Sequence, residues 1–376
     1  MKVLVLKANH FPVCGASRLI ETVLAHVDRS RVTPVVGSLA REGQPHSIHY
    51  TSPRTADLPH VTIAWTGGMR SKAAIAALRA TIAQEGIGLV HSHDMRCDLL
   101  CALAGGSKGL GVPWVAQVHG WIGKEGRGRD RVFEWIDRCA VRSADEIWVG
   151  SRNAEADVRR TVGPKKRVRF LLNAADPSLV EGAHERAAAA RAGLGLPEGA
   201  FLVGTVGRLH RSKAHANLAE AVLRSGVDSM HALLLGFGPE KDNLLALARS
   251  PGAGGRIHVL GSESAESIPP LVAAMDVFAF PSLRESLPLA VLEAMQLARP
   301  IVATDVGDLR MVLDDGRAGL LVPPGDIDAL AVALRQLHAD PKQRAALGAA
   351  AAARARTVFA PRRLAKEMED AWLALA

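Results

Sequence analysis

Short apolar runs alternate with segments of helix length along the whole chain. The first half contains such runs at Val3–Leu6, Val35–Leu39, Val61–Ala64, Leu89–His91, Trp114–Val118, Glu146–Val149 and Val168–Leu172. The second half contains them at Leu202–Val206, Ala232–Leu235, Ile257–Leu260, Val277–Phe280, Ile301–Thr304 and Leu320–Val322. Strands separated by helix-length segments predict βα units and parallel sheets. About a dozen strands exceed what one sheet holds comfortably, so we expect an α/β protein of two doubly wound domains.

The boundary between the two domains is expected at a turn-rich break. The segment Asn173-Ala-Ala-Asp-Pro177 follows the last strand of the first half and combines three residue types that favour turns. The predicted domains are therefore residues 1–172 and residues 173–360. The Ala- and Arg-rich segment 182–195 predicts the first helix of the second domain, and 341–376 predicts two helices separated at Phe359-Ala-Pro361.

The stretch 278–300, FAFPSLRESLPLAVLEAMQLARP, predicts a strand, a loop and a helix in succession. Ser286 can cap the helix, and Pro288 suits its first turn, where a missing N–H loses no partner. The helix is expected to end near Leu297, before Pro300. Its N-terminus offers free N–H groups and a positive dipole, which suit an anionic ligand, most simply a phosphate.

Two glutamates flank this predicted helix start. Glu285 precedes the helix, and Glu293 lies about two turns further on among apolar residues, so it is expected to be partly buried. Glutamates in such places are commonly a dipole complement or a solvated side chain. A partly buried carboxylate beside a phosphate site instead indicates hydrogen bonds from hydroxyl groups, such as those of ribose and a second sugar.

In parallel sheets ligands bind beyond the carboxyl ends of the strands, and three second-half loops at that edge carry suitable groups. One loop contains Gly207, Arg208 and Lys213, whose planar guanidinium and point charge suit a diphosphate. The next contains Gly236 and Gly238. The third begins at Gly261-Ser262, where exposed backbone could bind the edge of a base.

The corresponding first-half loops carry a glycine, histidines and arginines. Gly15 precedes a helix without a GxGxxG pattern, so a dinucleotide-binding enzyme is disfavoured. His93-Asp94 and His119 follow two strands; histidines there are either structural or in contact with substrate, and their spacing does not indicate a metal site. The segment 120–135 is either a solvated loop or an acceptor-binding loop. The acceptor-side candidates are His93, Asp94, Trp121, Arg127 and Arg129.

The chain of 376 residues has 4 cysteines without a CxxC pair, no apolar run that would span a bilayer and no signal-peptide pattern, so a cytoplasmic setting is expected. Residues 1–175 carry 25 Lys and Arg against 15 Asp and Glu, and the remainder carries 21 against 23. The first half therefore favours an anionic partner, such as an acidic glycan or the inner face of a membrane, although the excess could serve solubility alone. Nucleic acid is disfavoured because only 4% of residues are aromatic.

The loop motifs together resemble those of retaining glycosyltransferases of the GT-B fold, family GT4 (glycosyl transferases group 1). The resemblance covers almost the whole chain and is strongest over 204–326. The matching segments are Gly207-Arg208, Lys213, Gly236 with Gly238, Phe280-Pro281-Ser282, the Glu285 and Glu293 pair, and Gly319-Leu-Leu-Val-Pro-Pro-Gly325. It implies two Rossmann-like domains facing a central cleft, an acceptor-side one followed by a donor-binding one, with the terminal helix 361–376 packed back on the first.

The resemblance also implies roles for individual residues. Arg208 and Lys213 would hold the donor diphosphate, and Glu293 the ribose hydroxyls. Glu285 would bind a hydroxyl of the transferred sugar, and His119 would face that sugar. The implied catalytic set is Glu285, Arg208, Lys213 and His119; the donor-binding set is Gly15, Gly207, Gly236, Gly238, Gly261, Ser262, Ser286, Leu287, Leu289 and Glu293.

Four positions depart from the family pattern. Ala214 replaces the usual glycine after the lysine, and Ala174 replaces the glycine of an Asn-Gly linker. Pro288 occupies a common glycine position, and the loop 306–309 lacks a double glycine and a glutamate. None of these departures removes a charged group from the predicted site.

The expected function is transfer of a hexose-type sugar from a UDP- or GDP-sugar to a hydroxyl of a glycan or lipid-linked acceptor, with retained configuration. The resemblance places this in bacterial cell-surface polysaccharide or lipopolysaccharide biosynthesis, in the cytoplasm or peripherally at the membrane's inner face. No cofactor or metal is expected, because cationic side chains replace the metal. A nucleotide-sugar epimerase and a non-catalytic sugar-nucleotide-binding interaction protein are the alternatives, although the intact charged residues disfavour the second.

Overall fold

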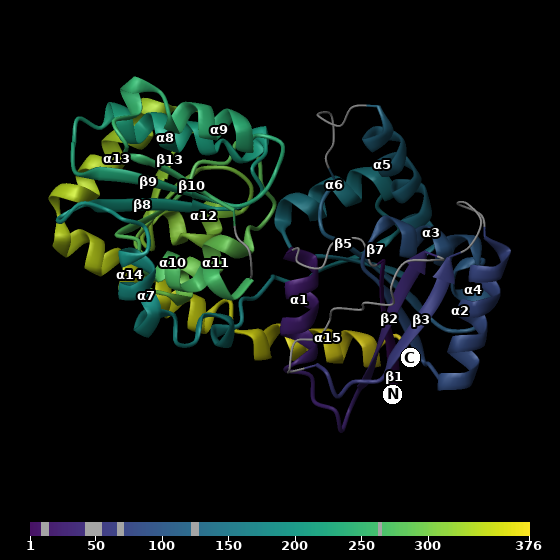
Figure 1. Ribbon diagram of the computed structural model, residues 1–376. Coiled ribbons are helices and arrows are strands. Elements are labelled where there is room, and N and C mark those ends of the chain that lie inside the picture. The colour runs from purple at the N-terminus through teal and green to yellow at the C-terminus, as the bar shows by residue number, and fades with distance from the viewer. Residues whose placement is uncertain (9–14, 42–54, 66–70, 122–127, 262–264) are drawn as a thin grey trace. The chain divides into compact units, whose positions relative to one another are not determined.

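The computed structural model describes residues 1–8, 15–41, 55–65, 71–121, 128–261 and 265–376 (Figure 1). The chain divides into two compact units. Unit 1 comprises Met1–Asn173 and Pro361–Ala376, and unit 2 comprises Ala174–Ala360. The terminal segment of the chain thus belongs to the same unit as its beginning.

Unit 1 contains a seven-stranded parallel sheet in the order β3-β2-β1-β4-β5-β6-β7. Its strands are β1 (Lys2–Ala8), β2 (Thr33–Arg41), β3 (His60–Trp65), β4 (Leu89–Ser92), β5 (Trp114–Val118), β6 (Glu146–Val149) and β7 (Arg167–Phe170). The central strands are apolar on both faces, as expected for a parallel sheet covered on both sides.

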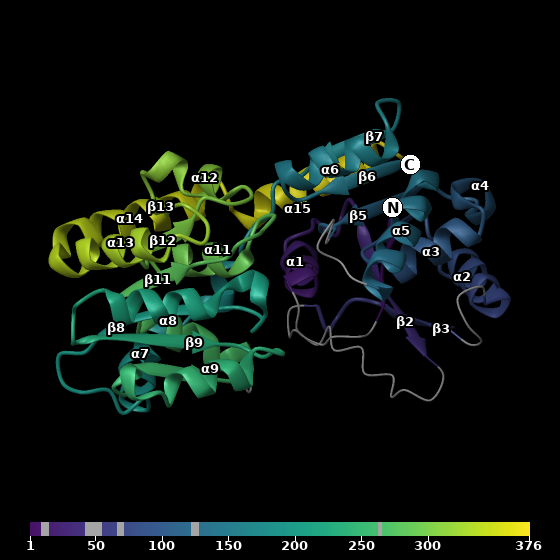
Figure 2. The same cartoon turned by 90° about the horizontal axis from the view of Figure 1, so that it is seen from above.

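Helices cover both faces of this sheet. One face carries α2 (Lys72–Glu85), α3 (Met95–Leu103), the short α4 (Gly106–Leu110), α5 (Arg129–Ala140) and α6 (Arg152–Val162). The other face carries α1 (Gly15–Leu24) and the terminal helix α15 (Pro361–Leu373), which lie together in both views (Figures 1 and 2). Gly37 on β2 faces Leu4 and Leu6, where a Cβ would lie 2.8 Å from Leu4 Cδ1.

Unit 2 contains a six-stranded parallel sheet in the order β10-β9-β8-β11-β12-β13. Its strands are β8 (Phe201–Val206), β9 (Met230–Leu235), β10 (Ile257–Leu260), β11 (Val277–Phe280), β12 (Ile301–Thr304) and β13 (Leu320–Val322). In Figure 1, α8 (His215–Arg224), α9 (Lys241–Ala248) and α13 (Ile327–Ala339) lie on one face. The other carries α7 (Ala183–Ala192), α10 (Ile268–Ala273), α11 (Leu289–Gln296) and α14 (Pro341–Thr357); α12 (Leu309–Val312) follows β12.

Two parallel α/β sheets confirm the predicted fold class, and each predicted apolar run overlaps one strand. The helix predicted after Glu285 differs at its start. Pro288, with φ −78° and ψ 119°, is the N-cap of α11 and provides no side-chain cap, and Ser286 lies two residues before it. The Ser286 carbonyl instead accepts a hydrogen bond of 3.0 Å from the Asp308 N–H, so this loop pairs with the loop after β12.

Each sheet reverses its direction of growth once. In unit 1 the reversal lies between β1 and β4, and in unit 2 it lies between β8 and β11. Loops that leave adjacent strands at such a point run to opposite faces and open a crevice at the carboxyl edge, where ligands bind. The topology thus directs attention to the loops after these four strands.

The terminal helix α15 is attached to unit 1 by one buried carboxylate. Glu369 is 3% exposed, and its Oε1 accepts a 2.7 Å hydrogen bond from the Asp28 N–H. Its Oε2 lies 3.1 Å from Nη1 of Arg31, while the exposed Asp370 pairs with the same guanidinium at 2.7 Å. Helix α15 is therefore held by a polar anchor to the segment between α1 and β2, as well as by apolar contacts to α1.

Glu369→Ala should lower the free energy of unfolding of unit 1 by about 1–3 kcal/mol, because the Asp28 N–H loses its acceptor. All six tryptophans of the sequence fall within unit 1, so tryptophan fluorescence during urea unfolding measures this unit alone. Asp370→Ala is the matched control and should change the midpoint little, since exposed ion pairs stabilise proteins weakly. Equal midpoints for the two variants would contradict the anchoring role of Glu369.

Candidate active site

The loops after β8 and β11 meet at the reversal point of unit 2. The loop after β8 contains a short 3-10 helix, Arg211–Lys213, and then Ala214, from which α8 begins. The Leu283 N–H of the second loop donates a 2.8 Å hydrogen bond to the Ser212 carbonyl of the first. This backbone contact holds the two loops side by side.

The predicted cation and carboxylate lie together across these loops. The Lys213 ammonium donates a hydrogen bond to Oε1 of Glu285 and forms an ion pair with it. The lysine side chain is 27% exposed and that of Glu285 is 9% exposed, so the carboxylate is the more buried partner. Lys213 Nζ also lies 5.8 Å from the centroid of the Phe280 ring. A buried carboxylate held by a lysine is positioned to accept hydrogen bonds from a neutral ligand.

Arg208 provides a second cation in the same loop. Its side chain is exposed, and within the described part of the chain it has neither an ion pair nor a hydrogen bond. Arg211, three residues further on, is directed elsewhere and pairs with Glu240 at 3.4 Å. Arg208 is therefore available to an anionic ligand in a way that Arg211 is not.

The glycines of the predicted donor site allow two backbones to approach closely. A Cβ on Gly236 (φ +150°) would lie 1.8 Å from the Gly207 carbonyl oxygen, and one on Gly238 (φ +157°) would lie 2.2 Å from that of Leu209. The Leu209 N–H donates a 2.7 Å hydrogen bond to the Phe237 carbonyl between them. Close packing of the two backbones is thus enough to require glycine at both positions. Donor binding by these glycines stays a prediction.

The remaining predicted donor residues of unit 2 lie on α11, in the loop before it and in the loop after β10. Glu293 is partly buried on α11, as expected, and it has an interaction partner. Leu287 is 7% exposed, and Ser286 and Leu289 are partly buried around the start of α11. A Cβ on Gly261 would lie 2.9 Å from the ring of Phe237, whereas Ser262 lies outside the described residues.

Gly307 was not singled out for the site from the sequence, and it is packed directly against the Glu285 loop. Its φ is +61°, and a Cβ there would lie 2.5 Å from the Glu285 carbonyl oxygen and 2.7 Å from that of Ser286. The loop after β12 therefore fixes the backbone that carries Glu285. The signal in the sequence is a glycine one loop downstream, which can be interpreted only once strand order is known.

In unit 1 the structure brings three histidines together at the carboxyl edge. His93 Nδ1 lies 3.4 Å from His119 Nε2, and the two rings stack with centroids 5.6 Å apart. His91 lies on the other side, with its ring centroid 4.1 Å from that of His93 and 4.8 Å from that of Trp148. Gly15 begins α1 after residues 9–14, which lie outside the described part.

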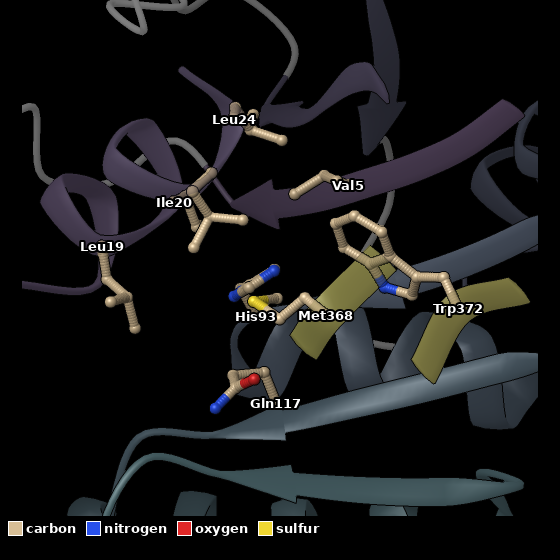
Figure 3. A pocket seen from close by; sticks show the side chains of 9 residues that line it. Val5, Leu19, Ile20, Leu24, His93, Gln117, Met368 and Trp372 are labelled. Atoms are coloured by element: carbon tan, nitrogen blue, oxygen red, sulfur yellow. The ribbon is translucent and has the colours of Figure 1, made fainter. Parts of the chain in front are cut away.

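A small apolar pocket adjoins the histidines on the face covered by α1 and α15. Figure 3 shows the imidazole of His93 near the side chain of Met368, with the indole of Trp372 on the next turn of α15. Nε2 of His93 and Nε1 of Trp372 are buried without a hydrogen-bond partner in the described residues. The remaining lining residues are Val5, Leu19, Ile20, Val23, Leu24 and Gln117. This wall is apolar enough to keep a histidine neutral.

Lys7 is a cation that the sequence analysis did not select. It is 8% exposed at the carboxyl end of β1, and it has no ion pair within the described ranges. Burial first, and then the charge of Lys7, lowers the pKa of His119 to about 4. Burial and the neighbouring His91, His119 and Lys7 hold the pKa of His93 well below its usual range. The signal in the sequence that could have identified Lys7 is a charged residue near the end of an otherwise apolar strand.

Two acceptor-side candidates have structural partners. Asp94 is the N-cap of α3, accepting hydrogen bonds from the N–H groups of Arg96 (3.1 Å) and Cys97 (3.2 Å), and from that of Ala8. Trp121 is 9% exposed, and its indole N–H donates a 2.7 Å hydrogen bond to Asp137 on α5. Arg127 lies outside the described residues, and only the backbone of Arg129 is described, at the start of α5.

No group of three or more His, Cys, Asp or Glu side chains with the geometry of a metal site occurs among the residues that the structure describes.

Lowering the pH from about 6.5 towards 4 should destabilise unit 1. Burial, and then the charge of His119, lowers the pKa of His91 to about 3. His91 therefore binds a proton near pH 6.5 in the unfolded chain but only near pH 3 in the folded state. Because the unfolded state binds more protons between these values, the free energy of unfolding falls on acidification. One such histidine contributes a slope of about 1.4 kcal/mol per pH unit.

His91→Leu should remove one histidine's share of this slope, measured by urea unfolding with tryptophan fluorescence between pH 7 and about pH 4.5. His60→Leu, at an exposed position on β3, serves as the control and should leave the slope as it is. An unchanged slope in the His91 variant would contradict the assignment of a neutral, buried imidazole.

Comparison with known proteins identifies a family for both halves of the chain. Residues 200–340 match the family described as glycosyl transferases group 1, and residues 14–174 match the glycosyl transferase 4-like domain. The chain is 32% identical over 293 residues to alpha-maltose-1-phosphate synthase of Mycolicibacterium smegmatis, covering 71% of this chain and 73% of that protein. It is 30% identical over 250 residues to alpha-D-kanosaminyltransferase of Streptomyces kanamyceticus, covering 63% and 64%.

Other relatives are matched over a smaller part of their length. The lipopolysaccharide core biosynthesis glycosyltransferase LpsE of Rhizobium meliloti is 33% identical over 186 residues, which span 50% of this chain and 52% of that one. Most of these curated relatives are matched over about half to two thirds of their length.

Solved structures share the fold over the full chain. HepE from Anabaena in complex with UDP has a TM-score of 0.84 at 21% identity, with 100% of both chains covered. Sucrose-phosphate synthase from Thermosynechococcus elongatus has a TM-score of 0.81 at 22% identity, covering 100% of this chain and 98% of that one. With two parallel-sheet units, these neighbours show the GT-B fold. The chain belongs to the group 1, GT4-type glycosyltransferase family.

Proposed function

We propose that this protein is a retaining glycosyltransferase, which moves a sugar from a nucleotide-diphosphate sugar to a hydroxyl of a glycan or lipid-linked acceptor. The observation that carries the proposal is the Lys213–Glu285 pair at the reversal point of unit 2, with Arg208, which has no side-chain partner among the described residues, in the same loop as Lys213. Two cations suit a diphosphate, and a carboxylate paired with one of them suits a sugar hydroxyl.

The chemistry follows from where charge develops. As the bond between the anomeric carbon and the phosphate oxygen breaks, negative charge grows on the leaving diphosphate and positive charge grows on the sugar ring. Arg208 and Lys213 stabilise the phosphate charge as it forms. The acceptor oxygen bonds to the anomeric carbon on the same face, and its proton passes to the leaving phosphate oxygen. These bond changes balance without a metal or an additional base. The membership of the chain in a glycosyltransferase family supports this assignment of the reaction.

Glu285 acts here as a donor-positioning group. Its carboxylate is held by Lys213, and its backbone is fixed by Gly307, so it offers a defined acceptor to one sugar hydroxyl. In the same proposal Glu293 binds the ribose hydroxyls, and His119 of unit 1 faces the transferred sugar. The low pKa of His119, about 4, keeps its imidazole neutral, so it can share a hydrogen bond with a hydroxyl near neutral pH.

Arg208→Met and Lys213→Met should each lower kcat by about 100-fold or more, because each removes a preorganised charge from the developing phosphate anion. Glu285→Gln should also lower the transfer rate, since its amide cannot replace both the ion pair and the hydroxyl acceptor. The donor is found first by a thermal-shift panel of UDP- and GDP-sugars, because bound ligand raises the unfolding temperature. Transfer is then measured with that donor.

Arg211→Met is the matched control, since Arg211 lies in the same loop but pairs with Glu240, and its rate should stay within about twofold of the parent. Near-full transfer by Glu285→Gln would refute its positioning role. NMR of the donor without any acceptor distinguishes the alternatives: an epimerase converts the donor alone, and a non-catalytic binding protein shifts its signals without turnover.

For the acceptor, we propose an anionic glycan or a lipid-linked molecule bound by unit 1, as a step of cell-surface polysaccharide or lipopolysaccharide synthesis. Unit 1 carries 28 Lys and Arg against 18 Asp and Glu. The similarity to a lipopolysaccharide core glycosyltransferase supports this class of acceptor. His93 and Asp94 stay acceptor-side predictions at the carboxyl edge, and the buried cation of Lys7 adds to the attraction for an anion.

Helix α5 is the surface we propose for peripheral contact with an anionic membrane. Trp135 is 65% exposed and Val132 is 55% exposed, one turn apart on the same side of the helix, beside the exposed Arg131. None of the described helices has the length and apolar character of a membrane span. An exposed tryptophan with basic neighbours is typical of a helix that lies in the interface of a bilayer.

Trp135→Ser should lower cosedimentation with vesicles of 30% phosphatidylglycerol by about fivefold or more, because it removes most of the exposed apolar surface of α5. The bound fraction should also fall as salt is raised, since the attraction is partly electrostatic. Val332→Ser on α13, where Val332 is 52% exposed in unit 2, is the control and should bind as the parent does. Equal binding by both variants would exclude α5 as the contact surface.

A further inference from the structure

We propose that His215 is a donor-binding residue whose imidazole N–H donates a hydrogen bond to a diphosphate oxygen lying above Gly207. The proposal rests on the function proposed above and adds to it a group that the charged motifs do not include. His215 is the first residue of α8, two positions after Lys213, in the loop that follows β8.

The first observation is an unsatisfied buried imidazole. His215 is 2% exposed, and both of its ring nitrogens are buried without a hydrogen-bond partner in the described residues. Burying an N–H donor without a partner costs free energy, so such groups in native proteins usually have a partner in the working state. For comparison, the buried His231 of the same unit has its Nδ1 3.1 Å from Nε2 of His258.

The second observation is the start of α8 around this imidazole. Ala214 caps the ten-residue helix with φ +49° and provides no side-chain hydrogen bond. The first-turn N–H groups of α8 are therefore left without a side-chain acceptor, at the positive end of the helix dipole. The Lys213 ammonium, which is paired with Glu285, belongs to the same loop. An anion is the ligand that this combination favours.

The third observation is the space that Gly207 leaves beside the ring. A Cβ built on Gly207 would lie 3.7 Å from Cε1 and 3.9 Å from Nε2 of His215, with no other atom within 4 Å beyond its chain neighbours. Glycine leaves this position empty, on the side of the ring that carries Nε2. With glycine at position 207, no side chain of that residue lies between this edge of the ring and the end of β8, where the ligand is proposed to bind.

The ionisation state of the ring suits this role. Burial first, and then the charge of Lys213, lowers the pKa of His215 to about 4, so the imidazole is neutral at physiological pH. A neutral imidazole has one N–H to donate, and the tautomer with hydrogen on Nε2 directs it towards Gly207. His215 then supplies a hydrogen bond to the diphosphate, while the two cations supply the charge.

The test compares ligands with and without phosphates on two variants. His215→Leu fills a similar volume without a donor, and His215→Gln restores an N–H. Dissociation constants are measured by calorimetry for UDP and GDP and for uridine and guanosine. We expect His215→Leu to weaken binding of the diphosphate that the parent prefers by about 10- to 100-fold, the loss of one hydrogen bond to a charged group, and to leave nucleoside binding unchanged. His215→Gln should recover at least part of the loss.

His231→Leu, on β9 at the opposite end of its strand, is the control for removing a buried histidine from unit 2 and should bind the diphosphate as the parent does. Diphosphate binding by a folded His215→Leu equal to the parent's would overturn the proposal. An equal loss for nucleoside and diphosphate would also overturn it, because that pattern indicates a packing role. If His215→Leu does not fold, as judged by circular dichroism, His215→Gln decides the matter by its own ratio of diphosphate to nucleoside affinity. A parent protein that binds neither diphosphate fails at the proposed function instead, which is a separate result.

Discussion

The ion pair between Lys213 and Glu285 joins the two loops at the centre of unit 2. Each charge would be costly to bury alone, and together they neutralise one another in a place that water reaches poorly. The pair can form only because β8 and β11 are neighbours and parallel, so the loops that leave them emerge at the same edge. The hydrogen bond from Leu283 to Ser212 and the close approach of Gly307 then fix the two loops.

The packing around this pair explains several residue choices that otherwise look unrelated. Gly236 and Gly238 let the loop after β9 touch the backbone after β8, where no side chain has room. Ala214 adopts a left-handed backbone conformation that the family usually gives to glycine, and the helix begins there all the same. Gly307 likewise lets the loop after β12 approach the backbone of the Glu285 loop closely. A site of few charges thus depends on many close backbone contacts.

In unit 1, burial keeps the histidines at the sheet edge neutral, whereas in unit 2 the charges of Lys213 and Glu285 neutralise each other. His91 and His93 lie under α15, with His91 beside Trp148, in surroundings that favour the neutral imidazole, and His119 stacks on His93. The cation of Lys7 nearby acts in the same direction on His93 and His119. Neutral histidines at a sheet edge can share hydrogen bonds with hydroxyl groups across the physiological pH range, which is what a carbohydrate ligand requires.

Alternation of apolar runs with helix-length segments determined the α/β class and the approximate position of each strand, because parallel strands buried on both faces must be apolar throughout. The motif spacing likewise predicted that Lys213 and Glu285 belong to one site, and the structure pairs them. Local sequence rules predicted the ends of helices less well. Ser286 has the chemistry of a helix cap, but α11 starts at Leu289. The Ser286 carbonyl instead accepts a hydrogen bond from the Asp308 N–H. Trp121 and Asp94 show the same limit, since their partners on α5 and β1 are distant in sequence.

The tertiary structure alone decided which polar groups are buried and with what. Nothing in the sequence indicates that Lys7 is buried without an ion pair among the described residues, that Gly307 touches the Glu285 backbone, or that the imidazole of His215 lies beside Gly207. These facts depend on strand order and on how loops from separate βα units pack, and both are set by contacts between residues far apart in the chain. The sequence by itself determined the fold class and predicted the charged residues of the site; packing determined their partners, because desolvation and close contact arise only when distant segments meet.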